Sequence, residues 1–225
     1  TQRIAQEVAA GADADLLPID ADGNLAEADW AALGAADAII FGTPTYMGGP
    51  SWQFKKFADA SSKAWFTRAW QDKFFAGFSV SASLNGDKGQ TLAYLNTLAS
   101  QHGGLWISLG MMPANTLAAT RNDVNNLGGS VGLMVQAPSD AGADKIPQGD
   151  VDTARKFGER VAVGLVGHEA ARRVRFKSRV QVVRGAGGLR AAGPREQRVE
   201  QALLLQHQGI HAATVSSARR PSSNR

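Results

Sequence analysis

A continuous apolar run at residues 37–42 constrains the fold of this chain more than any other feature. It reads Asp-Ala-Ile-Ile-Phe-Gly and contains β-branched residues, and Pro44 is expected to end the strand. An apolar run without alternation is typical of a strand buried on both faces, as in parallel sheets covered by helices. A second such run lies at residues 74–80, and segments with helical spacing stand between the strands. This alternation predicts an α/β domain built on a parallel sheet.

The remaining elements follow from apolar spacing and from capping residues. Ser51 and Asp150 are expected to cap two of the helices, and Gly103 is expected to end a third in a positive-φ conformation. Helices are predicted at residues 1–10, 51–59, 90–102 and 150–165. Shorter strands are predicted at residues 14–19, 105–109 and 131–135.

Charge divides the chain into two unlike parts. Residues 1–167 carry 12 basic and 17 acidic side chains, whereas residues 168–225 carry 12 and 3. We therefore expect a folded domain over residues 1–166 and a basic, low-order tail over 167–225, which is either a solvated extension or a non-native segment. The tail has one Phe and no Tyr or Trp for base stacking, so no nucleic-acid partner is expected.

The absence of cysteine excludes several classes of chemistry. Disulfides, thiolate metal sites, iron–sulfur clusters and cysteine nucleophiles all need a residue that this chain lacks. His207 and His211 have helical spacing but no carboxylate pair nearby, so no metal site is predicted. No apolar run is long enough to span a bilayer and no secretory signal is seen, so a cytoplasmic protein without membrane insertion is expected.

Two glycine-rich loops follow the two strongest strands. One runs over residues 42–50 and the other over residues 81–89. Ligands of doubly wound sheets lie beyond the carboxyl ends of the strands, where glycine lets backbone N–H groups approach closely. The pair of loops therefore predicts a binding site at that edge of the sheet. No catalytic triad is recognisable.

The string from Asp37 to Thr45 resembles the third strand and flavin loop of the WrbA family. These proteins are flavodoxin-like NAD(P)H:quinone oxidoreductases, and related NADPH-dependent FMN reductases look similar. The resemblance continues through Phe54, Phe57 and Asp59, the loop from Ser81, residues 97–103 and the helix at 152–162, and it covers roughly residues 1–166. It implies a flavodoxin-like doubly wound parallel sheet of strand order 2-1-3-4-5.

The resemblance also implies FMN as cofactor, NAD(P)H as electron donor and a quinone-like small molecule as acceptor. It implies no catalytic side chain, because the flavin carries out the hydride chemistry itself. A homo-oligomer, dimer or tetramer, is a further expectation by resemblance. By matching position, one side of the flavin ring would be framed by Pro44, Thr45, Tyr46, Met47 and Gly48. Its other edge would be lined by Ser81, Ala82, Ser83, Asn85, Gly86 and Asp87, and Thr1 matches the last residue of the phosphate loop.

The chain departs from the family pattern at its start, in both glycine-rich loops and in a long connection over residues 111–129. Residues 85–88 read Asn-Gly-Asp-Lys where the family usually has a run of glycines. The first strand and most of the phosphate loop precede the position of Thr1, so strand 1 is expected to be missing from the sheet. This leaves an alternative to the enzyme: a non-catalytic flavodoxin-like module whose FMN binding is lost or weakened. Residues 46–49 read Tyr-Met-Gly-Gly where the family usually has Arg-Phe-Gly-Asn. Outside the loops, His102 is expected to cap or pack at a helix end. Asn115 and residues 121–123 (Arg-Asn-Asp) are expected to lie in a solvated connection.

Overall fold

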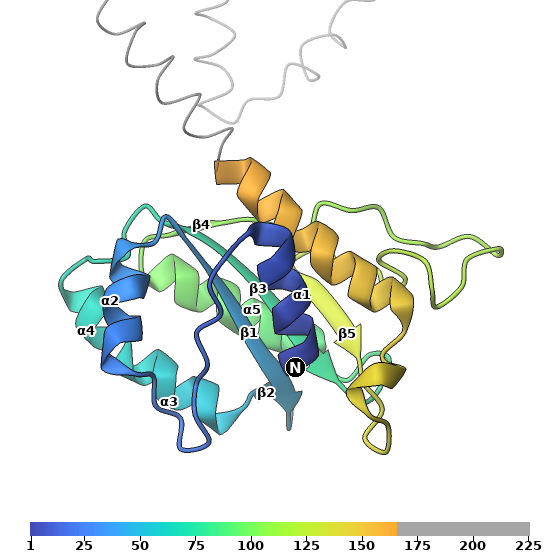
Figure 1. Cartoon of the computed structure of the whole chain (residues 1–225), viewed down its shortest axis with the longest axis horizontal. Coiled ribbons are helices and arrows are strands. Elements are labelled where there is room, and N and C mark those ends of the chain that lie inside the picture. Colours follow the sequence, from blue (N-terminus) through green and yellow to red (C-terminus); the bar gives the residue numbers. More distant parts are fainter. Residues whose placement is uncertain (166–225) are drawn as a thin grey trace, which may run out of the picture. The chain divides into compact units, whose positions relative to one another are not determined.

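A computed structural model of the chain describes residues 1–165. These residues lie in one compact unit. The predicted domain boundary at residue 166 and the predicted basic tail lie outside the described residues. Helices and a largely parallel sheet confirm the predicted α/β class (Figure 1).

The sheet is built on two long parallel strands. β1 (Ala38–Tyr46) pairs with β3 (Phe74–Ser81) in a register that runs from Ala38 opposite Phe74 to Pro44 opposite Val80. The predicted end of the first strand at Pro44 is wrong, because β1 continues through Pro44 to Tyr46. On its other edge β3 pairs with β4 (Leu105–Trp106) near its start and with β5 (Leu133–Gln136) near its end. β2 (Gly49–Pro50) lies antiparallel to the last residues of β1.

β4 and β5 are two pieces of one strand position, because both pair in parallel with the same edge of β3. They are shorter than the predicted strands at residues 105–109 and 131–135, and the chain between them leaves the sheet. The order β1, β3, β4/β5 corresponds to the last three strands of the predicted order 2-1-3-4-5.

The predicted strand at residues 14–19 is wrong. This segment has no regular structure. Within the described residues, the edge of β1 that faces away from β3 pairs only with β2. A strand is defined by its hydrogen-bonded neighbour, so an extended segment without a ladder is not a strand.

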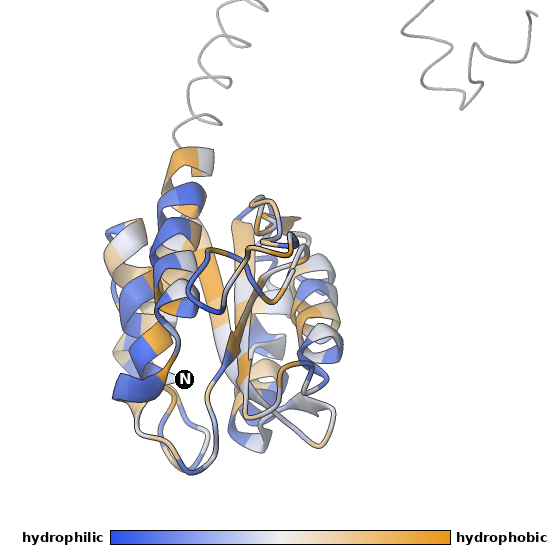
Figure 2. Cartoon of the chain, turned by 90° about the vertical axis from the view of Figure 1, so that its right-hand side faces the viewer, coloured by the Kyte–Doolittle hydropathy of each residue, from blue (hydrophilic) through white to orange (hydrophobic). Residues whose placement is uncertain are grey.

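Helices cover both faces of the sheet (Figures 1 and 2). α1 (Gln2–Ala12) and a helix over residues 148–165 lie on one face, while α3 (Trp52–Ala60) and α5 (Lys88–Gln101) lie on the other. The remaining helices are α2 (Glu27–Ala35), α4 (Ser62–Phe66) and the 3₁₀ turn η1 (Ala143–Lys145).

Each face of the sheet has its own core, because successive side chains of a strand point to opposite faces. Ala76, Phe78 and Val80 of β3 pack with α1 and with the helix over 148–165, whereas Phe75 packs toward α3 and α5. The predicted apolar faces of α3 and α5 are confirmed as buried: Phe54, Phe57, Ala58, Leu92, Leu95 and Leu98.

The predicted helix ends are confirmed at two positions and wrong at one. Ser51 caps α3 by accepting a hydrogen bond from the Phe54 N–H at 3.4 Å, and Gly103 follows α5 with φ of 75°. Asp150, predicted as an N-cap, lies inside the first turn of the helix over 148–165. Its carboxylate instead binds Arg121 and the Gln136 N–H.

Two glycines bring α1 close to the helix over 148–165. A Cβ built on Gly158 would lie 2.1 Å from the Val8 carbonyl oxygen, and one on Gly11 would lie 2.0 Å from that of Arg155. The Arg155 guanidinium also binds the Glu7 carboxylate of α1 at 2.8 Å. The helices therefore meet backbone to backbone at this point.

Replacing Gly158 should show what this close approach contributes. We expect Gly158→Ala to lower the free energy of unfolding by about 1–3 kcal/mol, because a backbone oxygen must move to admit the methyl group. Gly34 of α2 is the matched control, since a Cβ there has nothing within 4 Å. Gly34→Ala should leave stability unchanged or raise it by up to about 1 kcal/mol. Chemical denaturation measures both, and equal effects would contradict the close contact.

His102 packs inside the aromatic core, as predicted. Its ring lies 4.5 Å from that of Trp70, and its Nε2 is 3.0 Å from the Ser61 Oγ. The Ser61 hydroxyl donates to the Ala58 carbonyl at 2.6 Å, so it accepts from a protonated Nε2. Nδ1 is then the unprotonated nitrogen, and it is buried without a partner. Burial lowers the pKa of His102, because a second proton would sit in an apolar setting.

The lowered pKa of His102 makes stability depend on pH. The unfolded chain binds this proton more readily, so the free energy of unfolding should fall as pH drops below about 6.5, the ordinary histidine value. One proton contributes at most about 1.4 kcal/mol per pH unit. We expect His102→Gln to show a flatter pH dependence between pH 7 and 5 than the wild type. Parallel curves from urea titrations would contradict this assignment.

Candidate functional site at the carboxyl edge of the sheet

The structure brings the two predicted loops to one edge of the sheet. β1 and β3 are parallel neighbours, so the loops that follow Tyr46 and Ser81 leave the sheet at the same end. The N-terminus of α1 lies toward this end in both views (Figures 1 and 2). The predicted site residues therefore gather around one edge, although they come from three separate segments.

The first loop is a tight hairpin. Tyr46 pairs with Gly49, and the two residues between them, Met47 and Gly48, have φ of 49° and 81°. Positive φ at both central positions is the signature of a type I′ turn, which suits the twist of a hairpin. Met47 is wholly exposed and Tyr46 is 64% exposed. The hairpin therefore presents two unpartnered apolar side chains beside the end of β1.

The Thr45 side chain points into the protein instead. Its Oγ1 lies 2.7 Å from the Ser79 hydroxyl and 2.8 Å from that of Thr91. The Ser79 hydroxyl also donates to the Thr43 carbonyl at 2.9 Å. Thr45 can therefore face a ligand only through its backbone, while its side chain fixes the base of the hairpin, and the adjacent Pro44 is half-buried.

The second loop offers a row of free donors. In the described structure, the backbone N–H groups of residues 82–86 donate to no protein acceptor. Ala82, Ser83 and Asn85 are exposed, and Ser81 lies half-buried where β3 ends. Gly86 and Asp87 both have positive φ, and a Cβ on Gly86 would lie 2.0 Å from the Ser81 Oγ. Glycine therefore suits this position better than any residue with a Cβ.

Sequence reasoning missed Lys88, which lies beneath this loop. Its side chain is fully buried, and its Nζ donates to the Ser81 Oγ at 2.8 Å and to the carbonyls of Ser83 and Leu84 at 2.8 and 2.9 Å. Desolvation lowers the pKa of Lys88, and the negative charge of Asp150 partly opposes that shift. A lysine directly after a glycine-rich loop and before an apolar helix was the signal in the sequence.

Thr1 occupies the N-cap position of α1 without a side-chain cap bond, and it is exposed. The first N–H groups of a helix have no intrahelical acceptor, so this turn is a place where an anion can bind. α1 therefore adds a third set of backbone donors at the same edge of the sheet.

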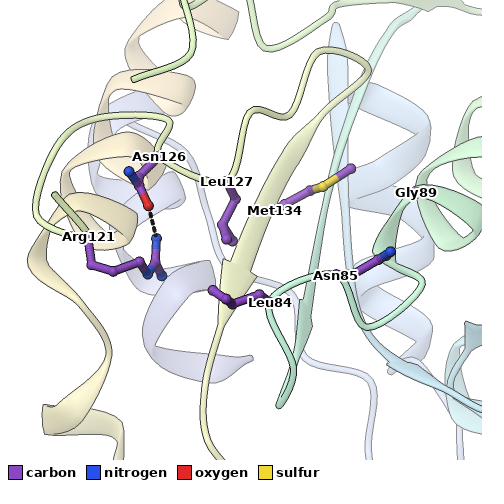
Figure 3. A pocket seen from close by; sticks show the side chains of 7 residues that line it. All are labelled: Leu84, Asn85, Gly89, Arg121, Asn126, Leu127 and Met134. Atoms are coloured by element: carbon purple, nitrogen blue, oxygen red, sulfur yellow. Dashed lines mark hydrogen bonds between the residues drawn. The ribbon is translucent and has the colours of Figure 1, made fainter. Parts of the chain in front are cut away.

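A pocket of about 470 Å³ lies between the second loop, β5 and the segment over residues 107–132 (Figure 3). Of the predicted site residues, Asn85 lines it and the hairpin residues do not. Its lining consists of Leu84, Asn85, Gly89, Arg121, Asn126, Leu127 and Met134. The pocket therefore lies on the β5 side of the second loop, away from the hairpin.

The expected solvated connection is confirmed for Asn115, Asn122 and Asp123, which are exposed, and is wrong for Arg121, which is half-buried. Its guanidinium binds the Asp150 carboxylate through two hydrogen bonds of 2.8 and 3.2 Å, and it also donates to the Asn126 side chain at 3.1 Å. Asp150 accepts the Gln136 N–H at 2.9 Å, and the Gln136 amide donates to the Ala82 carbonyl at 3.1 Å. This chain of contacts ties the segment over 107–132 to the second loop.

The described residues contain no cluster of His, Cys, Asp or Glu that is suited to hold a metal ion. Among the same residues, no helix is both long and apolar enough to cross a membrane.

Comparisons with known proteins assign the family. The family model described as NADPH-dependent FMN reductase matches residues 2–119. The flavodoxin FldP of Pseudomonas aeruginosa is 59% identical over 162 residues, which cover 72% of this chain and 88% of that protein. The NAD(P)H dehydrogenase (quinone) of Trichlorobacter lovleyi is 28% identical over 130 residues, covering 58% of this chain and 62% of that protein.

A solved structure supports the same assignment. The crystal structure of a flavodoxin, WrbA-like protein from Agrobacterium tumefaciens matches with a TM-score of 0.61 and 55% identity, covering 74% of this chain and 90% of that one. Together these matches confirm the resemblance predicted from the sequence. This chain belongs to the flavodoxin-fold family of NADPH-dependent FMN reductases and WrbA-like proteins.

Proposed function

We propose that this protein binds FMN at the carboxyl edge of the sheet and reduces quinone-like acceptors with electrons from NAD(P)H. One observation carries the proposal: five consecutive backbone N–H groups, at residues 82–86, have no acceptor among residues 1–165 and follow a strand that is parallel to the hairpin strand. Such donors suit the carbonyl-rich pyrimidine end of a flavin. Family membership supports FMN as the cofactor and NAD(P)H as the donor.

In this proposal each segment of the edge has its own task. The first turn of α1, from Thr1, holds the phosphate through its free N–H groups. The hairpin, with Pro44, Thr45 and Gly48 in its backbone and Tyr46 and Met47 at its surface, frames one side of the ring. The second loop lines the other edge through Ser81, Ala82, Ser83, Asn85, Gly86 and Asp87.

The bound flavin would supply hydride transfer, accepting a hydride from NAD(P)H and passing two electrons to an acceptor. The chain's own residues bind and orient the ring, and no side-chain acid or base is required. Tyr46, Met47 and Trp52 are exposed apolar side chains on and beside the hairpin. They offer a surface on which a flat quinone or nicotinamide can stack.

The quinone acceptor is supported by relatives described as NAD(P)H dehydrogenase (quinone). Self-association as a dimer or tetramer and a cytoplasmic location remain predictions.

A second candidate function is a flavodoxin-like module that has lost FMN. It is favoured by one observation: within residues 1–165, the edge of β1 that faces away from β3 pairs only with β2, so no longer strand braces the hairpin on that side.

A single variant tests the proposal at the second loop. We expect the wild-type chain to quench FMN fluorescence on binding and to oxidise NADPH when 1,4-benzoquinone is present. Gly86→Ala should weaken FMN binding at least tenfold, because the added methyl meets the Ser81 hydroxyl and strains a positive-φ position. Gly34→Ala in α2 is the control and should bind as the wild type does.

Three outcomes have distinct meanings. A wild-type chain that binds no FMN supports the second candidate and refutes the enzyme. Tight FMN binding without NADPH oxidation refutes the proposed reductase activity but is consistent with the proposed flavin site. FMN binding that is unchanged in Gly86→Ala would mean that the flavin ring does not contact the second loop.

A further inference from the structure

Lys88 is an unusual case of a charged side chain that is buried in the protein. The side chain is fully buried, yet among the residues that the structure describes no carboxylate forms an ion pair with its ammonium group. Its three hydrogen bonds all go to one short stretch of chain: the Ser81 hydroxyl and the carbonyls of Ser83 and Leu84. Buried charges are costly unless they serve as hydrogen-bonding centres, so this lysine organises the second loop.

The direction of these bonds determines where the loop points its donors. In a trans peptide the C=O and N–H groups point in opposite directions, and the described chain has no cis peptide. The carbonyls of Ser83 and Leu84 face the Lys88 ammonium, so the N–H groups of Leu84 and Asn85 face away from it. Both N–H groups belong to the row without protein acceptors. The bonds to Lys88 therefore orient the N–H groups of Leu84 and Asn85 away from the ammonium group.

The ammonium also sets the sign of the field at this loop. Its charged neighbours are Asp150, Arg121 and Asp87. Arg121 and Asp150 form a pair at 2.8 Å and largely cancel each other, while Asp87 is exposed to solvent. A buried charge is screened less than an exposed one, so the positive charge of Lys88 dominates behind residues 82–86.

We propose that Lys88 is a positioning residue that orders the second loop and favours the reduced, more negative state of the flavin bound in front of it. This inference rests on the proposed FMN function and names the residue that tunes it. The flavin supplies the two-electron chemistry; Lys88 supplies a fixed positive charge behind the donors and touches neither cofactor nor substrate.

The test compares two lysines that both bind backbone carbonyls. Lys88→Met keeps the length of the side chain and removes its charge and donors. Lys88→Gln keeps donors without the charge. Lys73 is the matched control, because its Nζ also donates to backbone carbonyls, those of Gly34 and Ala36. Lys73 directly precedes β3 and therefore lies at the end of the sheet opposite the loops. Lys73→Met therefore removes a similar anchor far from the loops.

Two measurements separate positioning from charge. NMR order parameters of the amides at residues 82–87, recorded without FMN, report loop order. The midpoint potential of bound FMN, obtained by equilibration with a redox dye, reports the balance between oxidised and reduced cofactor. We expect Lys88→Met to lower the order parameters below about 0.6, the flexible range. Reduced FMN should bind at least tenfold less well relative to oxidised FMN, which is a potential lower by about 30 mV for a two-electron couple.

The controls make the result decisive. Lys73→Met should change neither measurement. Lys88→Gln should keep more of the loop order than Lys88→Met and still lower the potential, because its amide donates without charge. A potential equal to wild type in Lys88→Gln overturns the electrostatic role, and unchanged loop order in Lys88→Met overturns the positioning role. A wild-type chain that binds no FMN refutes the proposed function and the redox half of this inference, while loop order still decides the positioning half.

Discussion

The parallel pairing of β1 with β3 is the constraint on which the rest of the structure depends. It places the ends of two buried strands side by side, so the hairpin after Tyr46 and the loop after Ser81 must share one edge of the sheet. Each strand is held by a separate core on each face, and these cores fix its register against sliding. The site is therefore positioned by the sheet, while the loops supply its chemistry.

Buried polar groups then shape the edge that the sheet provides. Thr45, Ser79 and Thr91 share hydroxyl hydrogen bonds under the hairpin, and Lys88 gathers the carbonyls of the second loop. The Arg121–Asp150 pair binds the long segment over 107–132 to the same region. Unpaired polar groups are expensive to bury, so these networks are specific to one arrangement of the loops. Between residues 82 and 86 this edge also presents backbone N–H groups that have no acceptor among the described residues.

The sequence predicted the features that depend on local pattern. The strands from Ala38 and Phe74, the Ser51 cap and the Gly103 stop follow from apolar runs and turn chemistry, and the structure confirms them, except that β1 continues through Pro44 to Tyr46. It did not predict what depends on distant partners. The sequence of residues 14–19 predicts a strand, but the described structure has no strand there. Asp150 is predicted as a helix cap, but its carboxylate binds the Arg121 guanidinium. The Thr45 side chain points inward because it bonds Ser79 and Thr91, which lie far along the chain. Lys88 is buried because the second loop folds over its ammonium group.

An NMR titration of the ¹⁵N-labelled chain with FMN tests the central claim most directly, because it reports each backbone donor separately. The account predicts that the amides of residues 82–86, those of the hairpin at 45–48 and those in the first turn of α1 shift together as FMN is added. Shifts confined to the pocket around Arg121 and Leu127, or no shifts at all, would contradict a flavin held between the two loops.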